Sequence, residues 1–293
     1  MKNKSKLIVF SFFIASIYNI GAQSLLDKLK AEPIDTTFYT EATFKGTRVG
    51  VGHSVETRKK NSLEISVMNR FWNLSREEET ETSNSFIADR MSSRFGIDYS
   101  FTDRLTYGVG FSTLNNVLDN YVKYRLIRQQ DNGPNKFSLT AFQSATHRSI
   151  PGNTNANFND RLSFTTQLLF ARKFTRNFSL QISPTYIHRS TVSSDLDDNN
   201  QFAVGFAARY KLKGHTSIFS EYFYVANELN SVETFGVFSL GVNWELSDLL
   251  LQFKMTNTGN FVEDAFITQT RRNFNFEDGN FFFGFHATYF IQL

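Results

Sequence analysis

The sequence predicts an all-β protein: a closed antiparallel transmembrane β-barrel of about twelve strands with an N-terminal periplasmic or lumen-inserted segment. Three observations indicate this fold class. Residues 281–293 alternate between large apolar and smaller or polar side chains and end on Leu293, as barrel strands do when one face meets lipid. Similar alternation recurs along the chain, and the links between strands alternate in length. After Ile20 no apolar run is long enough to cross a bilayer as a helix.

Residues 1–22 are typical of a secretory signal peptide. Three lysines lie within the first six residues, an apolar stretch runs from Leu7 to Ile20, and Ala22 ends a small-residue cleavage site. The alternative is an uncleaved anchor helix, for which the apolar run is short. The three lysines are the only charged residues that cleavage would remove. The 31 Lys and Arg would then fall to 28, equal to the 28 Asp and Glu. The basic pI therefore gives no reason to expect a nucleic-acid partner.

The composition excludes several chemistries and suits a barrel wall. Cysteine is absent, which excludes disulfides, thiolate metal sites, a cysteine nucleophile and a lipid anchor on an N-terminal cysteine. The 33 Phe and 11 Tyr stand against only 4 Pro. Aromatic residues face lipid and form the interface girdles of such barrels, whereas proline removes ladder hydrogen bonds. We expect no cofactor.

The strands follow from period-two alternation, most clearly over residues 94–101. There Phe95, Ile97, Tyr99 and Phe101 oppose small or charged residues. The same alternation appears over residues 62–67, 105–112, 202–210 and 249–256, and more weakly near Phe137, Ser217 and Val232.

The links between strands alternate in length, as periplasmic turns and extracellular loops do. The short turns lie at residues 102–104, 175–177, 213–215 and 247–248, and the long links at 73–91, 146–160, 191–200 and 257–280. Counting back from the C-terminus places both chain ends in the periplasm. The link 129–136 is longer than a turn requires. A secreted β-sandwich or propeller is the alternative fold, but charges in the middle of strands favour a wet lumen.

The segment 23–57 precedes the predicted barrel, residues 58–293, and carries two short motifs. These are ATFKGTR at 42–48 and GHSVET at 52–57. With GIDYSFTDRLTYGVG at 96–110 and TNTGNFVEDAFITQT at 256–270, they resemble a family of predicted outer-membrane β-barrels of unknown function. The resemblance implies the same fold and location. It indicates no particular activity, because none is assigned to the family.

Two interpretations of segment 23–57 remain open. It is either a periplasmic lead-in whose glycines permit a bend, or a plug folded into the lumen. In the second case four of its side chains would meet the wall charges Asp98, Lys123 and Arg125. Those four are Lys45, Arg48, His53 and Glu56.

The predicted pore-lining residues of the wall are mostly basic. They are Arg94, Asp98, Lys123, Arg125, Arg209 and Lys254, with Glu64 as a further acid. A basic lumen favours anions, although salt bridges could equally fill a narrow barrel. The leading hypothesis is a narrow channel for small, anionic solutes. The alternative is an outer-membrane scaffold that presents its loops or N-terminal segment to a protein partner.

Enzymatic and metal sites have weaker support. His188-Arg189-Ser190 has the bare His-x-Ser spacing of membrane phospholipases without their flanking residues, so we expect no catalytic residue. The acidic runs 77–81 and 195–198 lack the spacing of a calcium loop and predict no metal site. We expect outer-membrane lipid and lipopolysaccharide around the barrel and a small solute within it. The sequence identifies no protein partner.

Overall fold

The computed structural model describes residues 38–73, 88–149, 157–275 and 280–293. The predicted signal peptide and the acidic run 77–81 lie outside the described residues. Residues Tyr39–Leu293 form one compact unit. No helix in the described ranges is long and apolar enough to cross a membrane.

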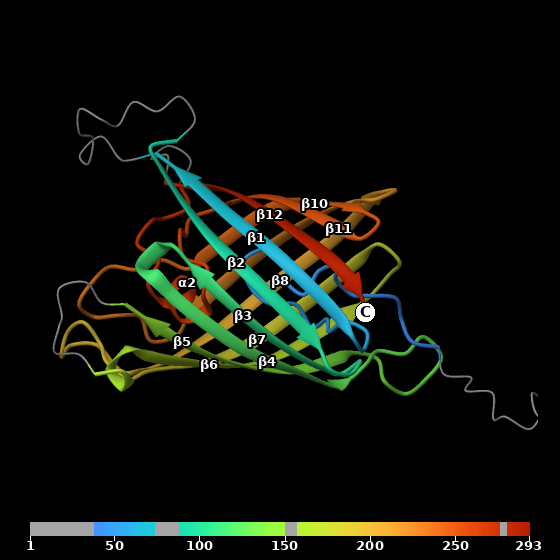
Figure 1. The fold of residues 1–293 in the computed structure, drawn as a ribbon, viewed down its shortest axis with the longest axis horizontal. Helices are drawn as coiled ribbons and strands as arrows, with labels where there is room; N and C mark the ends of the chain where they lie inside the picture. Colours follow the sequence, from blue (N-terminus) through green and yellow to red (C-terminus); the bar gives the residue numbers. More distant parts are fainter. Residues whose placement is uncertain (1–37, 74–87, 150–156, 276–279) are drawn as a thin grey trace, which may run out of the picture. The chain divides into compact units, whose positions relative to one another are not determined.

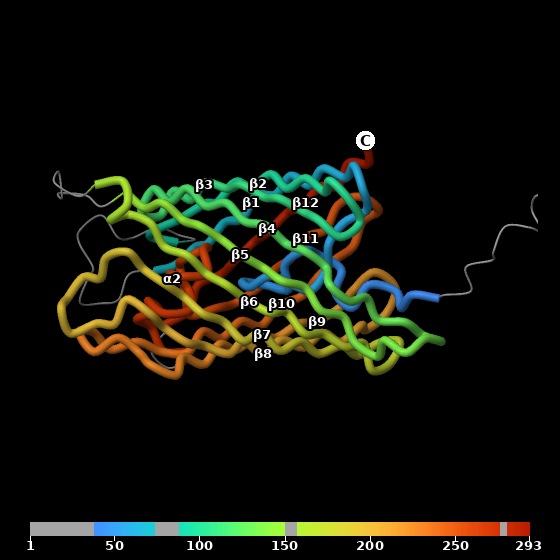
Figure 2. The backbone as a smooth tube through the Cα atoms, turned by 90° about the horizontal axis from the view of Figure 1, so that it is seen from below, coloured from blue at the N-terminus to red at the C-terminus, as the bar shows by residue number. Residues whose placement is uncertain are grey.

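Twelve antiparallel strands close into a barrel in which each strand pairs with its neighbours in sequence and β1 pairs with β12 (Figures 1 and 2). The strands are β1 (Ser62–Trp72), β2 (Arg90–Ser100), β3 (Leu105–Ser112), β4 (Val117–Ile127), β5 (Ser138–Arg148), β6 (Leu162–Lys173), β7 (Phe178–Arg189), β8 (Asn200–Lys213), β9 (Thr216–Val225), β10 (Val237–Leu246), β11 (Leu249–Thr256) and β12 (Phe282–Gln292). The predicted fold class and strand number are confirmed.

The two faces of the wall have opposite polarity. In β6, Ser163, Thr165 and Gln167 are buried, whereas Phe164 and Leu168 are exposed. The outward positions of the other strands are likewise mostly apolar, and their inward positions are mostly polar with a few large apolar residues such as Phe142 and Phe219. A soluble sandwich would bury the apolar face, so this arrangement and the closed wall exclude that alternative.

Most short connections lie at one end of the barrel and most long connections at the other; the links 128–137 and 113–116 are the exceptions. The turn end carries the links 101–104, 128–137, 174–177, 214–215 and 247–248, together with the start of β1 and the C-terminus. The loop end carries the links 73–89, 113–116, 149–161, 190–199, 226–236 and 257–281. The strand expected near Val232 is β10, but it begins only at Val237, and Val232 itself lies in the preceding loop. That loop is anchored by Asn230 and Ser231, whose amides bond to Asp197.

The long link at the turn end supports the N-terminal segment. Tyr39 pairs with Gln130 as an isolated antiparallel bridge, and the Thr40 amide donates to the Gln129 carbonyl at 3.0 Å. The additional residues of this link therefore pair with the chain at Tyr39 and Thr40, just before the chain enters the barrel.

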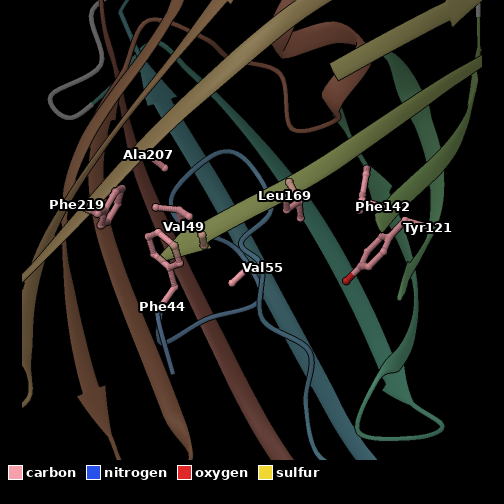
Figure 3. Close-up of a cluster of buried hydrophobic side chains, with 9 residues drawn as sticks. Phe44, Val49, Val55, Tyr121, Phe142, Leu169, Ala207 and Phe219 are labelled. Atoms are coloured by element: carbon pink, nitrogen blue, oxygen red, sulfur yellow. The ribbon is translucent and has the colours of Figure 1, made fainter. Parts of the chain in front are cut away.

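Two segments outside the wall fill the interior. Residues 43–57 enter and leave at the turn end, and residues 257–270, with the short helix α2 (Glu263–Thr268), fold in from the loop end. Figure 3 shows residues 43–57 looping among the strands, with Phe44, Val49 and Val55 in one apolar cluster with wall residues. The wall contributes Tyr121, Phe142, Leu169, Ala171, Ala207 and Phe219 to this cluster.

Candidate functional site: the occupied lumen

Residues 46–54 form a tight hairpin inside the barrel, called the lumen hairpin below. The Val49 amide donates to the Gly52 carbonyl at 3.0 Å, and the Ser54 amide donates to the Thr47 carbonyl at 2.9 Å. Gly50 lies at the tip against the wall: a Cβ placed there would be 2.2 Å from the ring of Phe219. Only glycine allows the hairpin main chain to approach the wall so closely.

Wall side chains hold the tip of the hairpin through its main chain. The Glu221 carboxylate accepts the Val51 amide at 2.6 Å and the Gly52 amide at 3.2 Å. Gln252 donates to the Val49 carbonyl at 2.7 Å, and the Lys254 ammonium donates to the Gly50 carbonyl. A carboxylate and an ammonium from the wall thus satisfy main-chain groups that no regular ladder pairs.

A second set of contacts holds the two arms of the segment, one entering from the turn end and one returning to it. Lys123, fully buried, donates to the carbonyls of Thr47 at 3.2 Å and Glu56 at 2.6 Å. Arg125 donates to the Glu56 carboxylate at 3.2 Å and to the Thr57 carbonyl at 3.0 Å. These two strand residues therefore tie both arms of the segment to β4.

The hairpin meets α2 in the middle of the barrel. The Arg48 guanidinium lies 3.2 Å from the Glu263 carboxylate and also donates to the Val51 carbonyl at 3.0 Å. His53 Nε2 lies 3.4 Å from the same carboxylate, and its ring contacts Tyr121 and Phe142 at centroid distances of 4.4 Å. The segment from the turn end and the segment from the loop end thus share one buried acid.

Burial shifts the pKa values of His53 and Glu263 in opposite directions. Burial, followed by the positive charge of Arg48, holds the pKa of His53 well below its usual value. Burial raises the pKa of Glu263, and this effect outweighs the attraction of Arg48. His53 is therefore neutral at pH 7 while the hairpin is docked.

The loop-end segment is held by three arginines of the wall. Arg70 donates to the carbonyls of Thr258 and Asn260, both at 2.5 Å. Arg148 donates to the Asp264 carboxylate at 2.8 Å, and Arg189 donates to the Asp264 carbonyl at 2.9 Å. Asp264 is completely buried, and Arg148 is its ion-pair partner.

The structure brings most of the predicted site residues into these contacts, but not all in the predicted pairs. Glu56 meets Arg125, as expected. Arg48 and His53 meet Glu263 rather than Asp98. The remaining predicted residues pair along the wall or near the turn end: Lys45 with Glu245 at 3.1 Å, Arg209 with Glu245 at 3.3 Å, and Arg94 with Asp119 at 2.9 Å.

Sequence reasoning missed the residues that hold the hairpin tip and the loop-end segment. Glu221 lies on the inner face of β9 together with Phe219 and Phe223, whereas Tyr222 and Tyr224 face outward. Because aromatic residues occupy both faces of this strand, local alternation does not single out Glu221. Glu263 and Asp264 lie within the stretch 256–270, whose sequence resembles the family but gives no sign that these two acids are buried. Nothing local indicates that this link folds inward, because its partners Arg70, Arg148 and Arg189 are distant in sequence.

The inner face of the wall carries an excess of positive charge. Among the described strand residues, seven basic side chains are buried against four acidic ones, an excess of three. The basic ones are Arg70, Arg94, Lys123, Arg125, Arg189, Arg209 and Lys254, and the acidic ones are Glu64, Asp98, Asp119 and Glu221.

The other candidates make ordinary structural contacts. His188 is half-buried on the opposite face of β7 from Arg189 and lies 2.8 Å from the Asn200 side chain. Asp197 accepts hydrogen bonds from Asn230 and Ser231. Within the described ranges, no group of three or more His, Asp or Glu side chains is placed to bind a metal.

A family model, the membrane-bound β-barrel domain DUF5777, matches residues 44–290. The chain belongs to this family. The match begins at Phe44, so it covers the lumen hairpin and α2 as well as nearly the whole wall of this DUF5777 barrel. No curated protein matches the chain.

Solved structures of similar fold are outer-membrane proteins of low sequence identity. The NanC porin has a TM-score of 0.50 at 9% identity, covering 78% of this chain and 99% of the porin. The KdgM porin has a TM-score of 0.49 at 9% identity, covering 77% and 98%. An outer-membrane channel from Pseudomonas putida F1 has a TM-score of 0.47 at 14% identity, covering 84% and 99%. At such identity the similarity to NanC concerns the fold.

Proposed function

We propose that this DUF5777 barrel is a plugged outer-membrane channel for small anionic solutes, in which the lumen hairpin is the plug. The observation that carries the proposal is the way the hairpin is held. Long polar side chains of the wall bond to its main chain at Val49, Gly50, Val51 and Gly52. A barrel that is only a scaffold can be filled by its own wall side chains. This one leaves space for a separate segment.

The wall beneath the plug suits a polar pathway. If the hairpin leaves, Lys123, Lys254 and Glu221 lose main-chain partners that water can replace, so they form a polar part of the exposed surface. The apolar side chains of Phe142, Leu169 and Phe219 lie on the same inner face. The buried strand residues carry three more positive than negative charges. Rings of arginine and lysine favour anions in pores, which supports a preference for anionic solutes.

The connections support an orientation in the outer membrane. Barrels of this class have short turns in the periplasm and longer loops outside the cell. The turn end, where the hairpin enters and the chain ends, would then face the periplasm. Outer-membrane lipid would cover the apolar face, and lipopolysaccharide would surround the loop end. The pathway needs no cofactor and no catalytic residue.

A scaffold that presents its loops to a protein partner is the second candidate. The observation favouring it is that segments from both ends meet at Glu263 and fill the middle of the barrel. It predicts that removing the N-terminal segment opens no pathway.

Planar-bilayer recording separates the two functions. Refolded protein lacking the signal peptide would be compared with a version that also lacks residues 24–57, and heat-modifiable migration would confirm that both barrels fold. The channel predicts rare openings of the longer form, steady conductance of the shorter form and an anion-selective reversal potential in a salt gradient. Silence from both folded forms would refute the channel and favour the scaffold.

A further inference from the structure

The outer face of the barrel carries a groove of about 420 Å³ over strands β6 to β9, near the turn end. These four strands are consecutive neighbours in the wall (Figure 2). The residues that line the groove are mostly apolar. Its volume lies within the range of roughly 300–1,000 Å³ that small-molecule sites occupy. The groove is therefore a hollow of ligand size in the surface that faces lipid.

The pairing of the strands explains why the wall is hollow here. Ala208 of β8 pairs with Ser220 of β9, and both small residues occupy outward positions. The outward residues on either side of this pair are large: Phe206, Tyr210, Ile218 and Tyr222. Two small side chains between two rows of large ones leave a depression in the surface.

One arginine lies in the same row of the sheet as the hollow. Arg172 of β6 pairs with Leu180 of β7, which pairs in turn with Ala208. Since neighbouring strands are about 4.8 Å apart, Arg172 and Ala208 are separated by about 10 Å along this row. Arg172 is next to last in β6, whereas Ala208 lies five residues before the end of β8. The arginine is therefore close to the turn-end surface of the membrane, and the hollow lies deeper in the wall.

The charge of Arg172 is not balanced by an acid on the outer face. Arg172 is exposed, lies 5.0 Å from the ring centroid of Phe174, and takes no part in the ion pairs of the described residues. Glu221, the one acid that lines the groove, belongs to the inner face, where it accepts the Val51 and Gly52 amides. A guanidinium group binds phosphate oxygens well, so Arg172 suits an anionic head group at the membrane surface.

We propose that this groove binds one phospholipid with a net negative head group. Arg172 binds the phosphate, and an acyl chain fills the hollow over Ala208 and Ser220. A head group with an ammonium would meet no carboxylate beside Arg172, which favours an anionic lipid. The site rests on the orientation given above, in which the turn end faces the periplasm, so the ligand is a phospholipid of the periplasmic leaflet. It does not rest on the channel, because the groove lies outside the wall.

Native mass spectrometry of the refolded barrel tests the site. The protein is released from detergent micelles that contain equal amounts of phosphatidylglycerol and phosphatidylcholine with identical acyl chains. We expect one phosphatidylglycerol per barrel, preferred about fivefold, the equivalent of about 1 kcal/mol for one basic residue near an anionic head group. Equal retention of the two lipids would overturn the assignment to an anionic head group. Retention of lipid A in place of phosphatidylglycerol, when both are offered, would overturn the assignment to a phospholipid.

Three variants assign the lipid to the groove. Arg172→Gln should lower the retention of phosphatidylglycerol about fivefold and abolish the preference over phosphatidylcholine. Ala208→Phe fills the hollow with a side chain that suits a lipid-facing position, and it should lower the retention of both lipids severalfold. Arg104→Gln, at an exposed arginine of the turn end that does not line the groove, is the matched control and should retain lipid like the parent. Retention at the parent level in both groove variants would overturn the site.

The same spectra show whether a second barrel occupies the groove. A dimer of the parent that Ala208→Phe dissociates would assign the groove to a second copy and overturn the lipid site. Heat-modifiable migration shows which variants fold, and if one groove variant does not fold, the other decides. Lipid retention without conductance would support this site and refute the channel, whereas conductance without lipid preference would support the channel and refute this site.

Discussion

Replacing Lys123 by Met should release the lumen hairpin. Lys123 is fully buried and donates to two carbonyls, one on each arm of the segment, at 3.2 Å and 2.6 Å. Hydrogen bonds to charged groups contribute about 1.5–3 kcal/mol each. Methionine has similar length and no donor, so both carbonyls lose their partner inside the barrel.

We expect Lys123→Met to weaken the docking free energy of the hairpin by about 3 kcal/mol. The loss is smaller than the full value of two such bonds because water entering from the turn end solvates part of the freed surface. That corresponds to a change of roughly 150-fold in the ratio of docked to released hairpin. Single-channel recording measures the change as a rise in open probability. Hydrogen exchange should increase in parallel over residues 43–57.

The matched control is Lys213→Met, which changes the same residue type at the exposed end of β8. It should leave the open probability and the exchange rates unchanged. If Lys123→Met also left both quantities at the parent values, with the barrel folded, the claim that wall side chains hold the plug would be refuted.

Three further predictions follow from the lumen contacts. Gly50→Val should give the conductance of the truncated form, because its side chain would overlap Phe219; parent-like closure in bilayers would contradict the close approach. Lys123→Glu combined with Arg125→Glu should shift the reversal potential toward cation selectivity, and an unchanged potential would argue against these residues lining the pathway. Lowering the pH from 7 to 5 should raise the open probability of the parent relative to His53→Gln. The pKa of His53 is depressed by burial and by Arg48 in the docked state, so only the released hairpin binds a proton below about pH 6.5, and docking weakens by up to about 1.4 kcal/mol per pH unit. Parallel pH profiles of the two proteins would exclude His53 as the titrating group.

The wall could be predicted from the sequence because it obeys a local rule. Alternation of period two places Phe95 and Ile97 outward and Arg94 and Asp98 inward, whatever the rest of the chain does. The start of the weak strand near Val232 was misplaced, since β10 begins at Val237, because a few apolar residues in a polar stretch do not define a register. There the amides of Asn230 and Ser231 bond to Asp197, in a loop that is distant in sequence.

The contents of the barrel could be predicted only in part. The glycines and mixed charges around Arg48 show no periodicity. They are therefore compatible both with a periplasmic lead-in and with a plug in the lumen. The partners that decide the path of this segment, Glu221 and Glu263, lie more than a hundred residues away. Such pairings follow from the closed wall, and a single sequence contains no local signal for them.

Thiol modification during recording tests the central claim most directly, because the chain has no cysteine of its own. Val51→Cys would place one thiol on the hairpin tip, where Val51 is 2% exposed and packs with Phe223 and Phe266. We expect a bulky, charged thiol reagent to react only when the hairpin leaves the lumen. The adduct then cannot return, so the channel stays open. A modified protein, identified by its mass, that opens and closes like the unmodified one would contradict the plug.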